Sequence, residues 1–253
     1  MRFASLGSGS RGNGTLIETG GTLVLLDCGF TITQVEQRMA RLGKRPTELS
    51  AIVVTHEHAD HIKGVGPLAR RYNIPVWLTP GTARHGRLGQ LPQLRYFNSH
   101  EKFAIHDLEL SPYPVPHDAQ EPAQFVFGDG QRRLGILTDV GCWTLHIEQQ
   151  LSRCDALLVE CNHDADMLFQ GSYPASLKQR VGGRHGHLSN AQAAELLGRL
   201  DNTKLQHLVA AHLSQENNQP HLAQRALAEV FGCESDWIAV ADQEQGLAWR
   251  EVI

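Results

Sequence analysis

Short apolar runs alternate with polar, glycine-containing connections along the whole chain of 253 residues. In the first half, runs typical of buried strands cover 3–6, 15–18, 22–27, 51–54 and 75–78. Gly20-Gly21 connects the second and third runs as a hairpin. Apolar residues recur at helical spacing over 32–42, just before Gly43, and a further helix is expected over 62–71.

The second half repeats this organisation. Strands are expected over 123–127, 133–137, 156–159 and 207–211, and helices over 144–152 and 191–200, with Ser189 as an N-cap. Two strand-rich halves with flanking helices, each ending its strands in polar residues, predict an α+β fold, a four-layer αββα sandwich. Because no linker or break in composition interrupts the chain, we expect a single domain over 1–253.

Composition places the chain among ordinary globular proteins, with 41% apolar and 20% charged residues. It has no run of 18 apolar residues and no N-terminal signal pattern, so we expect a cytoplasmic protein with no membrane partner. The five cysteines are odd in number and form no CxxC pair, which predicts reduced thiols.

The charge of the chain gives no general sign of nucleic-acid binding, because the formal net charge is −4. Local basic groups exist, and each could contact phosphates or simply form a solvated surface. They are Arg70-Arg71, Arg84 to Arg87, Arg132-Arg133 and Lys178 to Arg184.

The chemistry is concentrated in the heptapeptide Thr55–His61, directly after an expected buried strand. His56 and His58 stand two residues apart and can face one cation, whereas Asp60 and His61 can face a second. A solvated histidine-rich turn is the alternative. Four such groups in one short loop would be costly to desolvate without a cation, so the order HxHxDH predicts two neighbouring metal ions.

Three segments carry a resemblance to the metallo-β-lactamase-fold hydrolases, and they span nearly the whole chain. They are the Asp27-Cys28-Gly29 turn, the THEHADH segment at 55–61 and the closing stretch Ala211–Ser214. The resemblance implies three histidines at one metal, two histidines and an aspartate at the other, and a bridging aspartate. Those ligands would be His56, His58 and His117 for the first, Asp60, His61 and His212 for the second, and Asp139 between them.

Two of these positions have a second interpretation. His117 taken alone could be an ordinary loop histidine. Asp27 could orient a ligand histidine or could merely be the carboxylate of a tight turn, and both possibilities stay open at this point.

Further segments resemble the YycJ/WalJ branch, a group associated with 5′-exonuclease activity on DNA. They are Ser8–Asn13, Glu160–Asp164 and His185–Asn190. Glu160 followed by His187 also resembles the relay of the phosphodiesterase branch that includes RNase Z. By this resemblance Asp60 would both bind metal and accept a proton from the attacking water, and His187 would protonate the leaving group with its tautomer set by Glu160.

The other candidate residues have less specific roles. Ser8, Ser10 and Asn13 could contact a substrate phosphate, or their loop could be only a turn. His163 could line the site or hydrogen-bond a loop. His187 itself could instead cap the following helix.

The lengths between the motifs exclude some domain arrangements of the superfamily. Only 72 residues separate Asp139 from His212, which leaves no room for the inserted β-CASP domain of the RNase J-like enzymes. The long exosite arm of RNase Z is not expected either, although Arg84 to Arg95 could form a short flap.

We therefore predict a dinuclear-metal phosphodiesterase, a DNA 5′-exonuclease that uses a metal-bound hydroxide to hydrolyse phosphodiester bonds. The alternative is a small-molecule metallo-hydrolase acting on a cyclic phosphodiester, or on a thioester as in glyoxalase II. A non-catalytic binding protein would require lost ligands, and none is lost. Zn²⁺, Mn²⁺ or Fe²⁺ would suit the expected ligands, DNA is the expected partner, and the oligomeric state is left open.

Overall fold

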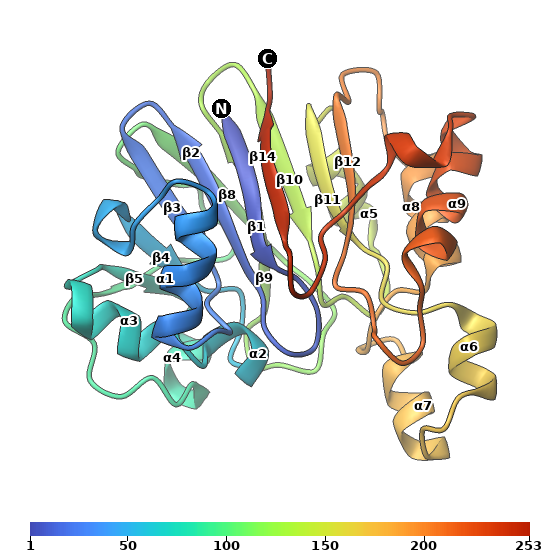
Figure 1. Cartoon of the computed structure of the whole chain (residues 1–253), viewed down its shortest axis with the longest axis horizontal. Helices are drawn as coiled ribbons and strands as arrows, with labels where there is room; N and C mark the ends of the chain where they lie inside the picture. The colour runs from blue at the N-terminus through green and yellow to red at the C-terminus, as the bar shows by residue number, and fades with distance from the viewer.

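Two seven-stranded sheets stand face to face in the computed structural model, which describes all residues 1–253 (Figure 1). Along the first sheet the strands are β14 (Leu247–Glu251), β1 (Arg2–Gly7), β2 (Gly14–Thr19), β3 (Thr22–Leu26), β4 (Ala51–Val53), β5 (Val76–Leu78) and β6 (Leu94–Tyr96). Along the second they are β13 (Ala239–Val240), β12 (His207–Ala211), β11 (Ala156–Glu160), β10 (Arg133–Leu137), β9 (Ala123–Gly128), β8 (Leu108–Pro114) and β7 (Phe103–Ile105).

The central strands are mostly apolar because both of their faces are buried. On β3, Val24 and Leu26 pack between the two sheets, whereas Leu23 and Leu25 face the outer helices. This alternation follows from the two-residue period of a strand. Burying each such side chain contributes about 1.5–3 kcal/mol, so the strands are held by both faces at once.

Helices form the two outer layers. On the first sheet lie α1 (Ile32–Arg41) and α3 (Val65–Tyr72), and on the second lie α5 (Leu145–Leu151), α8 (Asn190–Arg199) and α9 (Pro220–Phe231). Shorter helices are α2 (Ala59–Ile62), α4 (Pro80–His85), α6 (Ala165–Gln170), α7 (Ala175–Val181) and the 3₁₀ turns η1 (Pro46–Glu48) and η2 (Ser235–Trp237). The predicted four-layer αββα sandwich is confirmed.

One predicted helix is divided. The pattern over 62–71 was expected to be continuous, but α2 ends at Ile62 and α3 begins at Val65. Gly64 lies in the break, where a Cβ atom would come 1.9 Å from the carbonyl oxygen of Phe30. The chain turns here because the backbone of the Asp27–Phe30 segment approaches so closely, and Gly64 N donates to Cys28 O at 2.7 Å.

Strand directions bring the polar strand ends together. β3, β4 and β5 are parallel, and so are β10, β11 and β12. Their carboxyl ends lie at the lower edge of the sandwich in Figure 1, near α2. That edge therefore receives the loops that carry the expected ligands.

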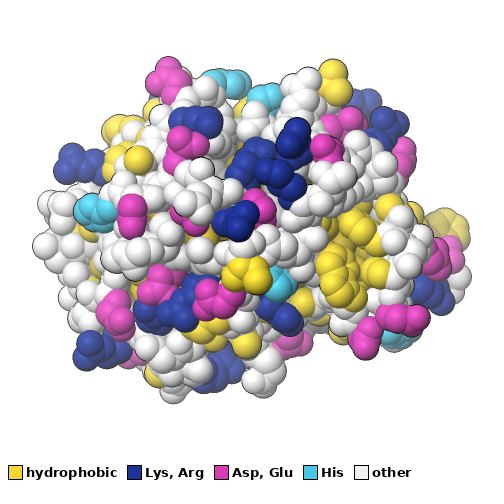
Figure 2. Space-filling view, turned by 90° about the horizontal axis from the view of Figure 1, so that it is seen from above, with side chains coloured by type: hydrophobic (Ala, Val, Ile, Leu, Met, Phe, Trp, Pro, Cys, Tyr) yellow, Lys and Arg dark blue, Asp and Glu magenta, His cyan; other side chains and the backbone are white.

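Other surfaces are less informative. Viewed from above, on the end that carries both termini, basic and acidic side chains are interspersed, and hydrophobic ones gather toward the side of α9 (Figure 2). No helix combines the length and apolar character needed to cross a bilayer. The single domain expected over 1–253 stays a prediction, which is supported by one apolar cluster shared by both sheets.

Candidate metal centre and active site

Three histidines from two loops form the first group of potential ligands. His56 and His58 follow β4, and His117 follows β8. The His56 ring centroid lies 4.6 Å from that of His58 and 4.9 Å from that of His117. His58 Nδ1 and His117 Nε2 are 3.2 Å apart, so their lone pairs converge on one point. These nitrogens could hold one metal ion.

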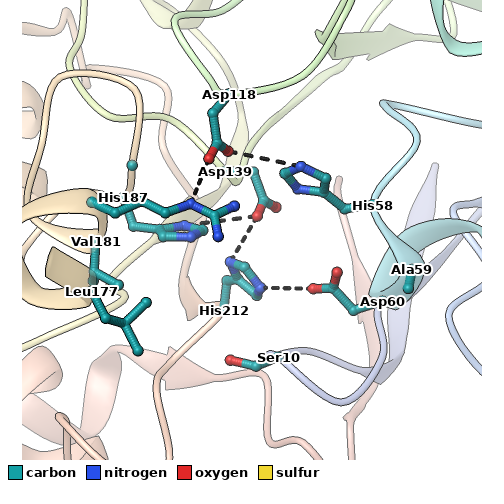
Figure 3. Close-up of a pocket in the computed structure, with 12 residues that line it drawn as sticks. Ser10, His58, Ala59, Asp60, Asp118, Asp139, Leu177, Val181, His187 and His212 are labelled. Atoms are coloured by element: carbon teal, nitrogen blue, oxygen red, sulfur yellow. Dashed lines mark hydrogen bonds and ion pairs between the residues drawn. The ribbon is translucent and has the colours of Figure 1, made fainter. Parts of the chain in front are cut away.

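Asp60, His61, Asp139 and His212 form the second group, which is nearly buried. His61 Nε2 lies 3.1 Å from Asp139 Oδ2 and 3.5 Å from Asp60 Oδ2. His212 Nε2 lies 3.5 Å from the same Asp60 oxygen. Figure 3 shows His212 between Asp60 and Asp139. The two groups adjoin, because the His56 and His61 ring centroids are only 4.2 Å apart.

Acceptors hold the remaining ring nitrogen of three ligand histidines, His56, His61 and His117. His61 Nδ1 donates to Asp27 Oδ2 at 2.8 Å, and His117 Nδ1 donates to Gly186 O at 3.1 Å. His56 Nδ1 donates to the Thr55 hydroxyl at 2.9 Å, which in turn donates to Asp27 Oδ2. Each ring is thereby fixed in the tautomer whose other nitrogen is unprotonated and can accept a metal. Asp27 thus orients a ligand, as one of its two interpretations required.

Glu160 is the central acceptor on the opposite side of the site. Its side chain is fully buried at the end of β11 and accepts five hydrogen bonds. Three come from the backbone N–H groups of Asp139, Val140 and Leu188, at 3.0 to 3.1 Å. The others come from Nδ1 of His187 at 2.8 Å and of His212 at 3.0 Å. Burial opposes the carboxylate charge, but His187 and His212 outweigh it and hold the pKa of Glu160 at about 2.

Backbone conformation is unusual at three of these positions. Asp27, Asp139 and His212 have φ values of 60°, 52° and 54°, in the left-handed region that non-glycine residues rarely adopt. Asp27 and His212 directly follow parallel strands, and Asp139 follows another after one intervening residue, Thr138. Such conformations cost of order 1–3 kcal/mol each and persist where surrounding contacts over-determine them, as at functional sites.

Buried polar atoms that lack a hydrogen-bond partner indicate whether this site suits metal ions. His56 Nε2, His212 Nε2 and Asp139 Oδ2 are buried and have no hydrogen-bond partner. Such groups are rare in folded proteins, and one metal-binding explanation covers all three. Nitrogen and carboxylate oxygen ligands in this combination suit Zn²⁺, Mn²⁺ or Fe²⁺. The residues therefore fit divalent metal ions.

Electrostatics of the metal-free site lead to the same conclusion. Burial opposes protonation of His212, but Asp139, Asp60 and Glu160 outweigh it and raise the pKa of His212 to about 10. Burial opposes protonation of His61 as well, yet Asp139 and Asp60 raise its pKa well above the ordinary value. The buried carboxylates thus stabilise positive charge between them. Divalent cations can supply this charge instead of protons on the histidines.

A cavity of about 330 Å³ opens onto both groups. His187 lies in its wall, with Nδ1 bound to Glu160, so that Nε2 is free to face a substrate. Figure 3 places Leu177 and Val181 on the side of His187, and Ser10 beyond His212. The wall is completed by His58, Ala59, Asp60, Asp118, Asp139, Arg180, Gly186 and His212.

Among the other residues expected to bind substrate, the structure places only Ser10 in the cavity wall. The Ser8 hydroxyl instead accepts a hydrogen bond from His212 N at 2.9 Å. Asn13 Nδ2 contacts two of the ligands, at 3.1 Å from His61 Nε2 and 3.3 Å from Asp60 Oδ2. His163 is buried, and its backbone carbonyl accepts from Asn190 N. A substrate role for these four residues stays a prediction.

The segment from Arg84 to Arg95, which could have formed a short flap, does not line the active-site cavity. This segment ends α4 and enters β6, and Leu88 within it is buried in the outer core of the first sheet. It is anchored there because Arg70 donates to Leu88 O at 2.9 Å. Sequence reasoning overlooked Thr55 and Asp118, although each directly adjoins a ligand histidine in the sequence.

Comparison with known proteins gives concordant results. Residues 22–212 match the model of the beta-lactamase superfamily domain. The chain is 34% identical to exodeoxyribonuclease YycJ of Bacillus anthracis, over 91% of this chain and 89% of that protein. It is 33% identical to exodeoxyribonuclease WalJ of Streptococcus pneumoniae, over 88% and 85% of the two chains.

A solved structure agrees in fold. The metallo-beta-lactamase fold protein YhfI from Bacillus subtilis superposes with a TM-score of 0.75 over 99% of both chains, at 16% identity. These matches confirm the predicted family and the predicted class of hydrolytic enzyme. The chain belongs to the metallo-β-lactamase superfamily and, within it, to the family of the YycJ and WalJ exodeoxyribonucleases.

Proposed function

We propose that the protein is a dinuclear-metal 5′-exonuclease that hydrolyses phosphodiester bonds of DNA. The observation that carries this proposal is the shared cavity onto which two adjoining groups of ligands and the His187–Glu160 pair open. The relatives YycJ and WalJ, which match most of the chain, are named exodeoxyribonucleases, in agreement with the function expected from the sequence.

The proposed ligands divide between two ions. His56, His58 and His117 would hold one, Asp60, His61 and His212 the other, and Asp139 would contact both. When bound, Zn²⁺, Mn²⁺ or Fe²⁺ would supply Lewis acidity, which activates water and polarises a phosphoryl oxygen. The protein itself orients each imidazole and keeps the carboxylates close together.

His187 is proposed to protonate the departing alkoxide. Burial opposes its charge, but the charge and hydrogen bond of Glu160 outweigh burial and raise the pKa of His187 above its ordinary value. A protonated imidazole with Nδ1 held by Glu160 can donate from Nε2 into the cavity. Asp60 is proposed to accept a proton from the attacking water in addition to its ligand role.

The first experiment follows the products of a DNA strand labelled at one end. Protein reconstituted with Mn²⁺ or Zn²⁺ should release mononucleotides from a 5′-phosphorylated oligonucleotide, and Asp60→Ala should abolish this turnover. Turnover that survives Asp60→Ala would overturn the proposal. So would turnover of a thioester or a cyclic phosphodiester far above that of DNA, which would favour a small-molecule hydrolase.

A second experiment isolates proton donation. Removing His187 should lower kcat about 10²- to 10⁴-fold on DNA, whose alkoxide leaving group needs a proton. His187→Ala should retain most activity on bis(p-nitrophenyl) phosphate, whose leaving group departs as a stable phenolate. His146→Ala, at an exposed position of α5, is the matched control and should behave as the unmodified protein. Equal losses on both substrates would refute the role of His187.

Several expectations stay predictions at this stage. They are the identity of the metals, DNA rather than RNA as substrate, and the cytoplasmic location. Metal analysis of reconstituted protein and matched DNA and RNA strands address the first two directly.

A further inference from the structure

The segment that carries α6 and α7 projects beyond the four layers, at the lower right of Figure 1. None of the α7 residues is buried, so this helix contributes nothing to the core. It nevertheless supplies Leu177, Arg180 and Val181 to the wall of the active-site cavity. Residues at positions i, i+3 and i+4 share one face of a helix, so one face of α7 is directed at the cavity.

Charge distinguishes this segment from the rest of the chain. Residues 165–187 include Lys178, Arg180 and Arg184 and a single acidic residue, Asp166, whereas the whole protein has a net charge of −4. Phe169, at the end of α6, is 80% exposed. Of the four basic groups in the sequence, only Lys178 to Arg184 reaches the cavity.

Arg180 is joined to the metal site through one carboxylate. Its Nε donates to Asp118 Oδ2 at 2.7 Å. The other Asp118 oxygen lies 3.5 Å from His117 Nε2 and 3.8 Å from His58 Nε2. The terminal amino groups of the guanidinium make no hydrogen bond within the protein, and the side chain is 64% exposed. A guanidinium held this way can donate hydrogen bonds to a phosphate from its two free amino groups.

The base of the segment is closely anchored. Its end packs tightly against the loop after β10. A Cβ atom added to Gly141 in that loop would lie only 2.3 Å from the carbonyl carbon of Arg184. His187 N donates to Val181 O at 2.8 Å, and Asp118 N donates to His185 O at 3.1 Å. Arg180 and the proposed proton donor His187 are thus held in one rigid unit.

We propose that the α6–α7 segment, residues 165–187, is the binding element for the single-stranded end of a DNA substrate. Arg180 binds a backbone phosphate next to the cleaved bond, and Leu177 and Val181 contact the terminal nucleoside. Lys178, Arg184 and Phe169 guide the following nucleotides by charge and by stacking on a base. This inference rests on the proposed function, and it adds how the site recognises a polymer.

Binding is the direct test. Anisotropy of a labelled single-stranded oligonucleotide would be measured with metal-loaded protein, using terminal phosphorothioate linkages that slow cleavage. Arg180→Ala should weaken binding at least tenfold, and Phe169→Ala should weaken it about fivefold to a hundredfold, as expected for loss of one stacked base. Arg180→Lys should recover only part of the loss, because lysine lacks the bidentate fork.

Salt dependence gives a second signature. Loss of one phosphate contact reduces the slope of log affinity against log salt by about 0.7 for a single strand. Arg225→Ala, at an exposed position of α9, removes the same charge away from the cavity and should change neither the affinity nor the slope. The inference would be overturned if Arg180→Ala and Phe169→Ala bound DNA as tightly as the unmodified protein does. It would also be overturned if the unmodified protein showed no measurable binding.

Turnover separates this inference from the proposed function. Arg180→Ala should raise the KM for DNA at least tenfold, whereas Arg225→Ala should leave both KM and kcat for DNA unchanged. A protein that binds DNA through Arg180 but releases no nucleotides would contradict the exonuclease activity alone. If the protein cleaves DNA and the Arg180→Ala variant does so with an unchanged KM, only the binding role is contradicted.

Discussion

Replacing Glu160 by glutamine tests whether one buried carboxylate organises both the fold and the chemistry around the site. Glu160 Oε2 accepts from Val140 N and Leu188 N, and Oε1 accepts from Asp139 N, His187 and His212. Glutamine preserves the shape but replaces one oxygen by an amino group that cannot accept.

The size of the loss follows from these contacts. If the amino group takes the Oε2 position it meets two backbone donors, and if it takes the Oε1 position it meets three donors. At least two hydrogen bonds to a charged acceptor are therefore lost, at about 1.5–3 kcal/mol each. We expect Glu160→Gln to lower the free energy of unfolding by about 3–6 kcal/mol, a large part of the 5–15 kcal/mol typical of a folded domain.

Urea unfolding of metal-loaded protein, followed by tryptophan fluorescence, measures this change, and the metal content is determined in parallel. Glu109→Gln is the matched control. Its side chain is 52% exposed and pairs only with Lys102 at the surface, so a change below about 0.5 kcal/mol is expected. If Glu160→Gln unfolds within about 1 kcal/mol of the unmodified protein and keeps its metal, the proposed organising role of Glu160 is refuted.

Two further predictions concern the ligand histidines. Asp27→Asn removes the charged acceptor of His61 Nδ1, so metal affinity should fall about 10- to 100-fold in a chelator competition; an unchanged affinity would leave Asp27 as a turn residue only. The pKa of His212 in metal-free protein is raised from 6.5 to about 10, so its stabilising effect is complete below pH 6.5 and is lost as the pH rises through 10. The urea midpoint of metal-free protein should therefore fall over this range, and a midpoint that stays constant would contradict the interpretation.

Much of the fold could be predicted from local patterns. Apolar runs such as Leu23–Leu26 identified strands buried on both faces, because side chains alternate across a sheet with a period of two. The divided helix near Gly64 could not be predicted in this way. Its interruption depends on the backbone of Phe30, which only the folded chain brings near.

The candidate ligands were likewise visible as polar residues directly after apolar runs. The HxHxDH order indicated His56, and the family resemblance implied Asp139 and His212. In the structure, parallel strands bring their carboxyl ends to one edge, so these distant residues become neighbours. The sequence left the role of Asp27 open, since a carboxylate in a turn and a carboxylate that orients a histidine have the same local pattern. The contact with His61 distinguished them.

What the sequence determined by itself was the chemical content of the site: imidazoles and carboxylates in an order that requires cations. Only the tertiary structure decided that Glu160 joins His187 to His212, and that α7 turns Arg180 toward the same cavity. The physical reason is that residue type and spacing specify which groups a chain can offer. Hydrogen-bond partners, burial and the pKa values that follow from them arise only between segments that folding brings together.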